Sequence, residues 1–552
     1  MAVAINGKWK INLGSFFING LTYLQRADLL KECITKLTEA GAQVTSVTFD
    51  GLSSNFSMAN HLGCCFKNVE DLKTWFPNPV NGSPIFVVLD PAHMLKLLRG
   101  TLGSRQIMFD SEDNSIIWKY FVDVYESQRL ALLHAGIKLT DLHINYRKKP
   151  MNVRLASQLF SKSVADSMQH LLDLNILQFE GCEGTIKFVR NINDLFDILN
   201  STKFKTLFQF KRPISNQNFY EICNKLSSLY TYLKGLKVRN KKSQLISILK
   251  SKKKAGFLGF LISIQSVISI FIHNNEHLKY LATYKLSQDH LELEFSKYRS
   301  LCGSNNNPTA KQFLINVRNS RISNDISCAT DNGNCIALDD IPILTINREQ
   351  CNKTPSLRAD NTEIFESEEF PFEFTLCDLT KLCRNIVYNI GGFCVRSVLK
   401  QNICETCCDF LVKKDDEYIP EQDLVDLKSM GFYKYPSNLM SKMFQEVEKI
   451  FRNSVCSDYE KLVFDVNYDA LIEKVIFVCT ANGLFNSIEE HFSLCHQNED
   501  YLTVLLLPLI EKFLKVRFHY AAKKCSEIIK TKNLKSNLSR QQSTRITHVN
   551  GL

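Results

Sequence analysis

The first part of the chain, up to about residue 92, mixes strand-like and helix-like patterns of apolar residues. The segments AVAI and KWKI flank the turn pair Asn6-Gly7 and predict a β-hairpin, which the segment SFFI extends. Apolar residues then recur at helical spacing over residues 27–41. Such a mixture of elements is typical of an α/β domain.

Two further strands are predicted in this part, at residues 42–50 and 84–90, with a short helix between them. The second strand is apolar throughout, which favours a parallel strand covered on both faces. The strands end in Asp50 and Asp90. Because open α/β sheets bind ligands at the carboxyl ends of their strands, we expect these two carboxylates to lie near a site.

Residues 93–265 show helical periodicity with few strand signals. Within and just beyond this region, residues 255–272 form an uncharged apolar run almost long enough to span a bilayer. Gln265 and several serines interrupt the run, and each of these polar groups would cost free energy in lipid. We therefore interpret it as a buried core helix, with a single membrane span as the alternative.

The stretch YKLSQDHLELEF, residues 284–295, reads as an amphipathic helix that carries three acids. Asp289 and Glu292 are three residues apart and share a helical face, whereas Glu294 points elsewhere. The apolar members of this helix are Leu286, Leu291, Leu293 and Phe295. Spacing alone favours a solvated acidic face.

Composition adds few constraints. A chain of 552 residues with 45% hydrophobic and 22% charged residues is long enough for several globular domains. The net charge of +10 is compatible with a nucleic-acid partner but does not require one. The 19 cysteines are irregularly spaced and the opening residues lack a secretory apolar core, which favours a reducing, intracellular compartment.

Several segments carry a family resemblance. They are VTSVTFDGLSSNFSMANHLGC, PIFVVLDPAHMLKLLRGTLG, MNVRLASQLFSKSVADSM, FVRNINDLFDILNS, YKLSQDHLELEF, SNNNPTAKQF and NIVYNIGGFCVRSVL. In this order they resemble the P-element transposases and their THAP-domain relatives. The resemblance covers most of residues 1–530.

The resemblance implies a mixed α/β, mostly helical fold: an incomplete ribonuclease H-like core, interrupted by a helical GTP-binding insertion and followed by a helical C-terminal domain. The expected boundaries are 1–92 for the first part of the core, 93–265 for the insertion, 266–324 for the second part of the core, 325–375 for an acidic and polar linker, 376–530 for the C-terminal domain and 531–552 for a disordered tail.

Enzymes of this family cut and join DNA with divalent metals held by three carboxylates. By motif, Asp50 resembles the second of these and Glu292 the third. The segment AVAINGKWKINLGSFF resembles the family's third strand, so we expect the strand with the first carboxylate, and the zinc-binding THAP domain, to be missing and the nuclease to be catalytically incomplete. Asp90 could substitute as a metal ligand, but a strand end followed by a helix start explains it equally well. His93 is interpreted as structural.

The second expected chemistry is nucleotide binding without a P-loop, since no GxxxxGK[ST] motif occurs. In the segment LFDILN, the ring of Phe196, the carboxylate of Asp197 and the amide of Asn200 can share one side of a helix. A carboxylate accepts two hydrogen bonds, which suits the paired N–H donors of guanine. The alternative is an ordinary amphipathic helix.

The resemblance adds further positions to this pocket. Asp289 would lie near the nucleotide's metal, Lys138 near its phosphates, and Val153 and Ser161 along the pocket wall. The implied cofactors are GTP, as a positioning group, and Mg²⁺ or Mn²⁺. The implied partner is DNA, with possible self-association, in the nucleus and without a membrane. Two alternatives stay open: a non-catalytic DNA- or protein-binding scaffold, and a membrane-anchored helical protein.

Two motifs remain outside this scheme. A basic run at residues 237–254 could contact phosphates or form a solvated surface helix. Cys404, Cys407 and Cys408 form a CxxCC motif, for which His491 and Cys495 could complete a zinc site. Buried free thiols are the alternative.

Overall fold

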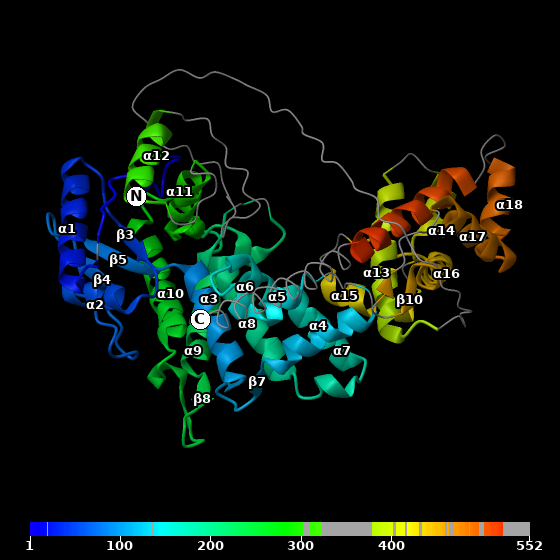
Figure 1. Ribbon diagram of the computed structural model, residues 1–552, viewed down its shortest axis with the longest axis horizontal. Helices are drawn as coiled ribbons and strands as arrows, with labels where there is room; N and C mark the ends of the chain where they lie inside the picture. The colour runs from blue at the N-terminus through cyan, green and yellow to red at the C-terminus, as the bar shows by residue number, and fades with distance from the viewer. Residues whose placement is uncertain are drawn as a thin grey trace, which may run out of the picture. The chain divides into compact units, whose positions relative to one another are not determined.

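The computed structural model describes residues 1–322 and 378–522, apart from gaps at 19, 132, 134–136, 203, 205, 302–307, 401–403, 415–416, 430–432, 459–460, 463–467, 485 and 496–501 (Figure 1). The linker expected at 325–375 and the tail expected at 531–552 lie outside the described residues. Two compact units are present. The first lies within Met1–Val122, Leu139–Ala165 and Gly181–Pro355, and the second within Asp123–Lys138, Asp166–Glu180 and Ser356–Leu552.

The first unit contains a three-stranded sheet of order β3-β5-β4. Its strands are β3 (Ser46–Phe49), β4 (Trp75–Pro77) and β5 (Pro84–Leu89). The pair β3 and β5 is parallel, with Phe49 opposite Leu89, as the apolar pattern predicts. This register sets the residues that follow the two strands, Asp50 and Asp90, side by side at one edge of the sheet.

Helix α10 (Ala255–Asn274) covers this sheet and packs on β5 and on α3 (Pro91–Arg105). Its serines bond directly to the strand: the Ser263 hydroxyl donates to the Leu89 carbonyl and accepts from the Leu89 N–H, both at 3.0 Å, and Ser266 donates to the Val87 carbonyl at 2.5 Å. Among the described helices, α10 is the one long and apolar enough to cross a membrane, and 72% of its apolar window is buried in the protein. The serines that interrupt the apolar run thus satisfy backbone groups of the sheet.

Small residues allow α10 to approach its neighbours closely. A Cβ at Gly256 would lie 3.0 Å from the Cβ of Leu97, and one at Gly259 would overlap the sulfur of Met94. A larger residue at either position would push the helix away from α3 and the sheet.

The N-terminal hairpin pairs β1 (Ala2–Val3) with β2 (Lys10–Ile11). Its loop is longer than the two-residue turn that the Asn6-Gly7 pair predicts, because the innermost backbone bond joins the Ala4 N–H to the Trp9 carbonyl. The strand expected in the SFFI segment is absent from the described residues there. Helices α1 (Tyr23–Glu39) and α2 (Ser53–Leu62) pack on each other, on the side of the sheet away from α10 (Figure 1).

The acidic helix α11 (Asp289–Ser300) has a different buried face from the one predicted. Leu291 and Phe295 are 36% and 37% exposed, whereas His290, Glu294 and Tyr298 are buried. Tyr298 accepts a hydrogen bond from Asn12 and, through its carbonyl, one from Asn316 of α12 (Ala310–Ile322). The amphipathic prediction is therefore wrong for Leu291 and Phe295, because polar partners bury the opposite face of α11, whereas Leu286, which precedes the helix, is buried as predicted.

The chain segment between α3 and α10 forms a second sheet of the first unit. Its strand order is β7-β6-β8-β9, and all neighbouring strands are antiparallel. Its strands are β6 (Ile107–Phe109), β7 (Ser115–Ile117), β8 (Lys237–Arg239) and β9 (Leu245–Ser247). The surrounding helices include α5 (Asp141–Ile144), α6 (Val153–Leu159), α8 (Glu183–Leu199) and α9 (Phe219–Lys234). The basic run at 237–254 is thus mostly a hairpin and the turns after it, which corrects the surface helix considered from the sequence.

The second unit is helical apart from the short pair β10 (Cys456–Asp458) and β11 (Lys461–Leu462). Helices α4 (Lys119–Ala131) and α7 (Lys162–Asp173) contribute their C-terminal residues to it. Its own helices are α13 (Lys381–Val398), α14 (Glu405–Leu411), α15 (Asp423–Lys428), α16 (Asn438–Val455), α17 (Tyr468–Ala481), α18 (Asn486–Cys495) and a helix at 507–522. Helix α16 packs on α13 and α17, and its Phe444 contacts Gly391, where a Cβ would lie 2.5 Å from the ring.

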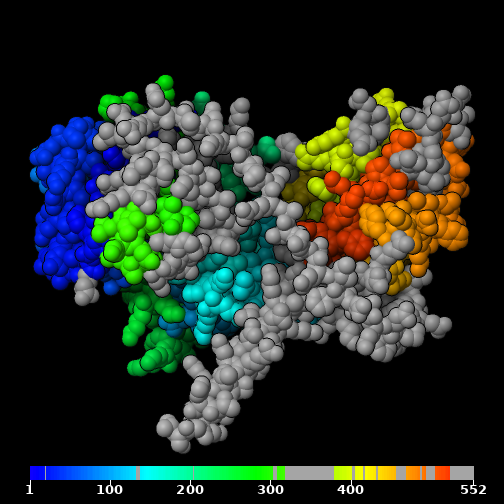
Figure 2. All heavy atoms as spheres, turned by 45° about the horizontal axis from the view of Figure 1, so that its top comes forward, coloured from blue at the N-terminus to red at the C-terminus, as the bar shows by residue number. Residues whose placement is uncertain are grey.

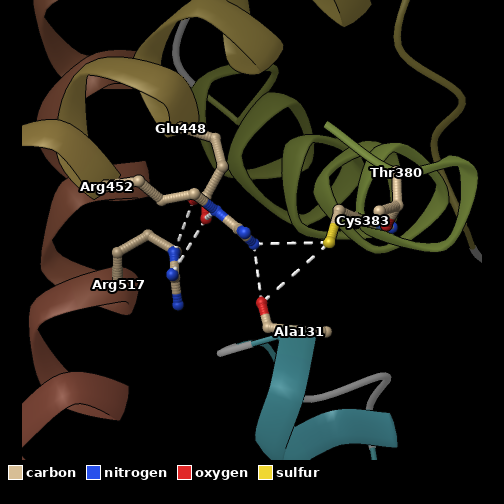
Figure 3. Close-up of polar contacts among 6 residues, drawn as sticks. All are labelled: Ala131, Thr380, Cys383, Glu448, Arg452 and Arg517. Carbon is tan, nitrogen blue, oxygen red and sulfur yellow. Dashed lines mark hydrogen bonds and ion pairs between the residues drawn. The ribbon is translucent and has the colours of Figure 1, made fainter. Parts of the chain in front are cut away.

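A charged cluster lies inside this helical unit (Figure 3). The Glu448 carboxylate is fully buried and accepts hydrogen bonds from Arg517 Nε at 2.6 Å and from Arg452 Nε at 2.8 Å. Arg452 also donates to the Ala131 carbonyl at 2.6 Å and to the Cys383 sulfur at 3.4 Å. One carboxylate therefore ties α16 to the helix at 507–522, and Arg452 ties α16 to α4 and α13.

Candidate metal and nucleotide site

Asp50 stands at the carboxyl end of β3, half-buried. Its Oδ1 atom accepts hydrogen bonds from the Leu52 N–H at 3.1 Å and from the Asn55 amide at 2.7 Å. Asn55 in turn accepts from Arg26 at 3.0 Å. These contacts orient the carboxylate through one of its oxygens.

Gly51 follows Asp50 in a tight space. A Cβ there would lie 2.9 Å from the Met94 methyl group and 3.5 Å from the His93 ring. The turn after β3 therefore packs directly on α3, which places Asp50 near the start of that helix.

Asp90, at the end of β5, uses both carboxylate oxygens for the backbone. It is the N-cap of α3, where Oδ2 accepts the His93 N–H at 2.8 Å, and Oδ1 accepts the Gln288 N–H at 3.1 Å. Burial raises the pKa of this carboxyl, and the two N–H donors oppose that shift. Asp90 thus clamps the start of α3 to the segment that precedes α11.

The same segment brings Glu292 to the sheet edge. Thr48 of β3 donates to the Leu286 carbonyl at 2.7 Å, and Gln288, held by Asp90, is the N-cap of α11. The Glu292 N–H bonds to the Gln288 carbonyl, so Glu292 lies one turn beyond this clamp. Asp289 begins the helix, and the Ser287 hydroxyl accepts its N–H at 3.3 Å.

The His93 ring is influenced by the charges of all three carboxylates. Burial and the positive charge of Lys96 lower the pKa of His93, whereas the charges of Asp50, Asp90 and Glu292 raise it. One imidazole therefore lies within electrostatic reach of all three carboxylates. Asp50 and Glu292 are both half-buried, and oxygen donors of this kind suit a hard divalent cation.

The nucleotide prediction centres on Asp197, in the last turn of α8. Asn193 donates to its Oδ2 atom at 3.2 Å, and the Lys211 ammonium lies 3.6 Å from its Oδ1 atom. Burial raises the pKa of Asp197 to about 6, although Lys211 lowers it. A half-buried carboxylate whose paired lysine lies 3.6 Å away fits a ligand that brings N–H donors.

An aromatic surface that the sequence did not indicate lies beside this carboxylate. The Lys211 ammonium sits 4.5 Å from the centre of the Phe208 ring, which is 40% exposed. Phe208 therefore offers a flat face close to Asp197 on which a base could stack. The segment around Phe208 has no periodicity, so only the fold reveals this proximity.

The other predicted pocket residues are placed as follows. Ser161 precedes α7, and the next N–H, that of Lys162, donates to Asn193 at 3.0 Å, so Asn193 links this end of α7 to Asp197. Val153 is half-buried at the start of α6, Phe196 is half-buried on α8, and Asn200 is the C-cap of α8. Lys138 is exposed and belongs to the second unit.

A buried hydrogen-bond lock joins α8 to the segment before α11. The hydroxyls of Ser201 and Thr283 lie 3.0 Å apart, each accepts the backbone N–H of the other residue, and Thr283 also donates to the Ile198 carbonyl at 2.5 Å. Both residues are almost fully buried. The end of the helix that carries Asp197 is therefore fixed to the strand-edge segment that carries Asp289 and Glu292.

Four domain families match parts of the chain. They are the TNP-like RNase H N-terminal domain at residues 1–63, the TNP-like GTP-binding insertion domain at 92–213, the TNP-like RNase H C-terminal domain at 284–314 and the C-terminal domain of DNA transposase THAP9 at 378–523. The expected fold class, an RNase H-like core with an inserted GTP-binding domain and a helical C-terminal domain, is confirmed.

Two curated relatives match as well. The chain is 28% identical to human DNA transposase THAP9 over 548 residues, which is 94% of this chain and 58% of that protein. It is 26% identical to the Drosophila melanogaster transposable element P transposase over 296 residues, 53% of this chain and 37% of that protein. The chain thus spans well under two thirds of the length of either relative.

A solved structure, the Drosophila P element transposase strand transfer complex, matches 53% of this chain and 63% of its own, with a TM-score of 0.44 and 24% identity. The domain families and the two relatives all point to transposases. Over the residues that they match, the chain is similar to THAP9 and P-element transposases.

Proposed function

We propose that this protein is a transposase-type DNA-binding protein that holds a divalent metal ion at Asp50 and Glu292 and a guanine nucleotide beside Asp197. The observation that carries the proposal is the lock between Ser201 and Thr283. It makes one rigid connection between the helix of the nucleotide site and the segment that positions Glu292. Such a connection suits a nucleotide that positions DNA rather than one that is consumed as fuel.

The metal would be Mg²⁺ or Mn²⁺, since both prefer carboxylate oxygens. It would polarise a phosphate oxygen of DNA, while Asp50 and Glu292 fix its position and Asp90 holds the scaffold. The relatives are named as transposases, so DNA is the proposed partner and the nucleus the proposed location. We also propose that the chain associates with itself.

A second function, a non-catalytic DNA- or protein-binding scaffold, is favoured by one specific observation. Both oxygens of Asp90 already accept backbone N–H groups, so the described residues of the strand edge offer Asp50 and Glu292 as metal ligands. Two-metal chemistry needs a carboxylate that bridges both ions. DNA binding without metal-dependent strand cleavage would favour the scaffold.

The nucleotide site is tested by replacing Asp197 with alanine. We expect the chain to bind GTP in preference to ATP and the variant to lose this preference, because charge-assisted hydrogen bonds to guanine are worth roughly 1.5–3 kcal/mol, or about 10- to 150-fold in affinity. Calorimetric titration with both nucleotides measures this ratio. Asp194→Ala is the matched control: Asp194 lies on the same helix and pairs with Lys225 at 2.6 Å, so its loss should leave the ratio unchanged.

Equal affinity of the unmodified chain for GTP and ATP would refute the assignment of Asp197 to the guanine edge. A preference for GTP that survives Asp197→Ala would place the base elsewhere on the insertion.

The preference for GTP should also depend on pH. Only the ionised carboxylate accepts both N–H groups of guanine, and the pKa of Asp197 is raised by burial to about 6. The ratio of GTP to ATP affinity should therefore be constant above about pH 7 and fall by up to tenfold per unit below pH 6. Titrations at a series of pH values measure it, and ATP corrects for the phosphates, which ionise alike in both nucleotides. A ratio that stays constant down to pH 5 would contradict the prediction.

A further inference from the structure

Two cysteines and a histidine from distant parts of the sequence converge in the second unit. The donor atoms of Cys404, Cys407 and His491 all lie within 4.8 Å of one another. The Cys404 sulfur is 3.2 Å from the His491 Nε2 atom, although the two residues are 87 positions apart. The cluster is separate from the carboxylates of the first unit.

The CxxC spacing produces the first half of this cluster. Cys404 is the N-cap of α14, and its sulfur accepts the Cys407 N–H at 3.3 Å. This turn brings both sulfurs to the same side of the chain. An N–H donor to sulfur also favours the thiolate, which is the form that binds metals.

The second half comes from α18, whose apolar residues Ile488 and Phe492 are buried in the helical core. The His491 ring contacts the rings of Phe410 and Phe492, with centroid distances of 5.9 and 5.8 Å. This aromatic packing fixes the ring while Nε2 faces the Cys404 sulfur.

Other cysteines of the same unit show what an ordinary core thiol looks like. Cys394 and Cys479 are buried among apolar residues on α13 and α17, and burial raises the pKa of each thiol to about 12. They fill the core as small apolar groups. Cys404 and Cys407 differ from them because an imidazole nitrogen stands beside the sulfurs.

The distances suit a tetrahedral zinc ion. With Zn–S near 2.3 Å and Zn–N near 2.0 Å, donor atoms around zinc lie roughly 3.3–3.8 Å apart. The observed cluster, with all donors inside 4.8 Å, needs shifts of about 1 Å or less to reach this geometry. Sulfur and imidazole ligands select zinc over magnesium or calcium.

We propose that Cys404, Cys407 and His491 bind a structural zinc ion. They supply three of the four protein ligands that structural zinc sites require. The side chain of Cys495, which the sequence offered as a further ligand, lies outside the described residues.

The ion would fasten two short helices to each other. Helices α14 and α18 have 7 and 10 residues, too few to be stable alone. Bringing together residues 87 positions apart costs chain entropy, and the bonds to the metal offset this cost. The free energy of metal binding therefore stabilises the folded unit.

The full chain, purified without added metal, should contain one equivalent of zinc. Cobalt(II) exchanged into the site should show the sulfur-to-cobalt charge-transfer bands and the intense visible bands of a tetrahedral thiolate site. Chelation of the zinc should lower the apparent Tm of the second unit by at least about 5 °C, and added zinc should restore it. The chelation experiment uses the unmodified chain and so does not depend on whether a variant folds.

The ligands are then tested one at a time with Cys404→Ser, Cys407→Ser and His491→Gln, each of which should lose the cobalt spectrum. Cys408→Ser is the matched control, because Cys408 adjoins the motif but is not part of the cluster, and it should keep the spectrum. Absence of both zinc and the cobalt bands from the folded chain would overturn the site.

Discussion

Replacing Glu448 by alanine should destabilise the helical unit by roughly 3–5 kcal/mol, the range observed when one partner of a buried ion pair is removed. The Glu448 carboxylate is fully buried, and Arg517, which donates to both of its oxygens at 2.6 and 2.9 Å, is 1% exposed. The variant would leave the Arg517 guanidinium buried without a counter-charge. Arg452 would lose the same partner (Figure 3). Denaturant unfolding of the full chain, followed by circular dichroism, measures the loss.

The control for this prediction is Glu511→Ala in the helix at 507–522. Glu511 pairs with Lys515 at 2.7 Å, but the Lys515 side chain is 63% exposed, and such surface pairs contribute about 0–1 kcal/mol. If Glu448→Ala costs no more than Glu511→Ala, the cluster does not stabilise the unit in the way that its burial indicates. Glu448→Gln, which keeps the shape but not the charge, separates the electrostatic loss from the cavity.

The parallel pair of strands could be predicted from the sequence because its signal is local. An apolar run that ends in aspartate is sufficient to place Asp50 and Asp90 at the carboxyl ends of β3 and β5, and the register of these strands brings the two residues side by side. The role of Asp90 was predictable only in part. A strand end followed by a helix start describes its N-cap contact with His93, three residues away, but its second partner, Gln288, is 198 residues away and meets it only in the folded chain.

Helix α11 shows why the sequence pattern failed in one place. Its buried face contains Glu294, whose charge raises the pKa of Lys10 against the larger lowering by burial, and Tyr298, which bonds to Asn12. Both partners belong to the N-terminal hairpin region, far away in sequence. Because tertiary partners decide which face of a short helix is buried, periodicity alone selected the leucines and the phenylalanine.

The apolar run of α10 was ambiguous for a related reason. A core helix and a membrane span have the same composition, and both bury an apolar surface on all sides. The two serines that bond to β5 distinguish them, since their partners are the backbone groups of Val87 and Leu89. Serine spacing in the sequence gives no indication of such partners.

Exposed side chains near Asp197 also bear on the nucleotide site. Figure 2 shows one face of the molecule, on which blue, cyan and green segments of the chain reach the surface. Within the first unit, exposed apolar side chains gather around Phe208, where Phe204, Leu207 and Phe208 are each at least 40% exposed. An exposed aromatic surface beside the half-buried Asp197 carboxylate is more consistent with a ligand site than with a solvated helix face.

Replacing Glu292 by glutamine should weaken Mn²⁺ binding to the first unit by at least about 100-fold, and Asp50→Asn should do the same. Even residues that only orient a metal ligand cost about 10- to 100-fold in affinity when they are lost, and a ligand itself should cost more. Electron paramagnetic resonance of free Mn²⁺ in the presence of the full chain measures the affinity. The double variant should show no binding at this site.

Two controls separate ligands from neighbours in this experiment. Glu294→Gln lies on the same helix, but Glu294 is buried toward Lys10, so this variant should bind Mn²⁺ as the unmodified chain does. Asp90→Asn should lower the melting temperature, because it weakens the clamp on His93 and Gln288, yet leave the affinity of the folded protein for Mn²⁺ within about threefold of normal, since the clamp residues are not ligands. If Asp90→Asn instead abolishes binding while circular dichroism stays unchanged, Asp90 is a metal ligand, and its two backbone hydrogen bonds must give way when the ion binds.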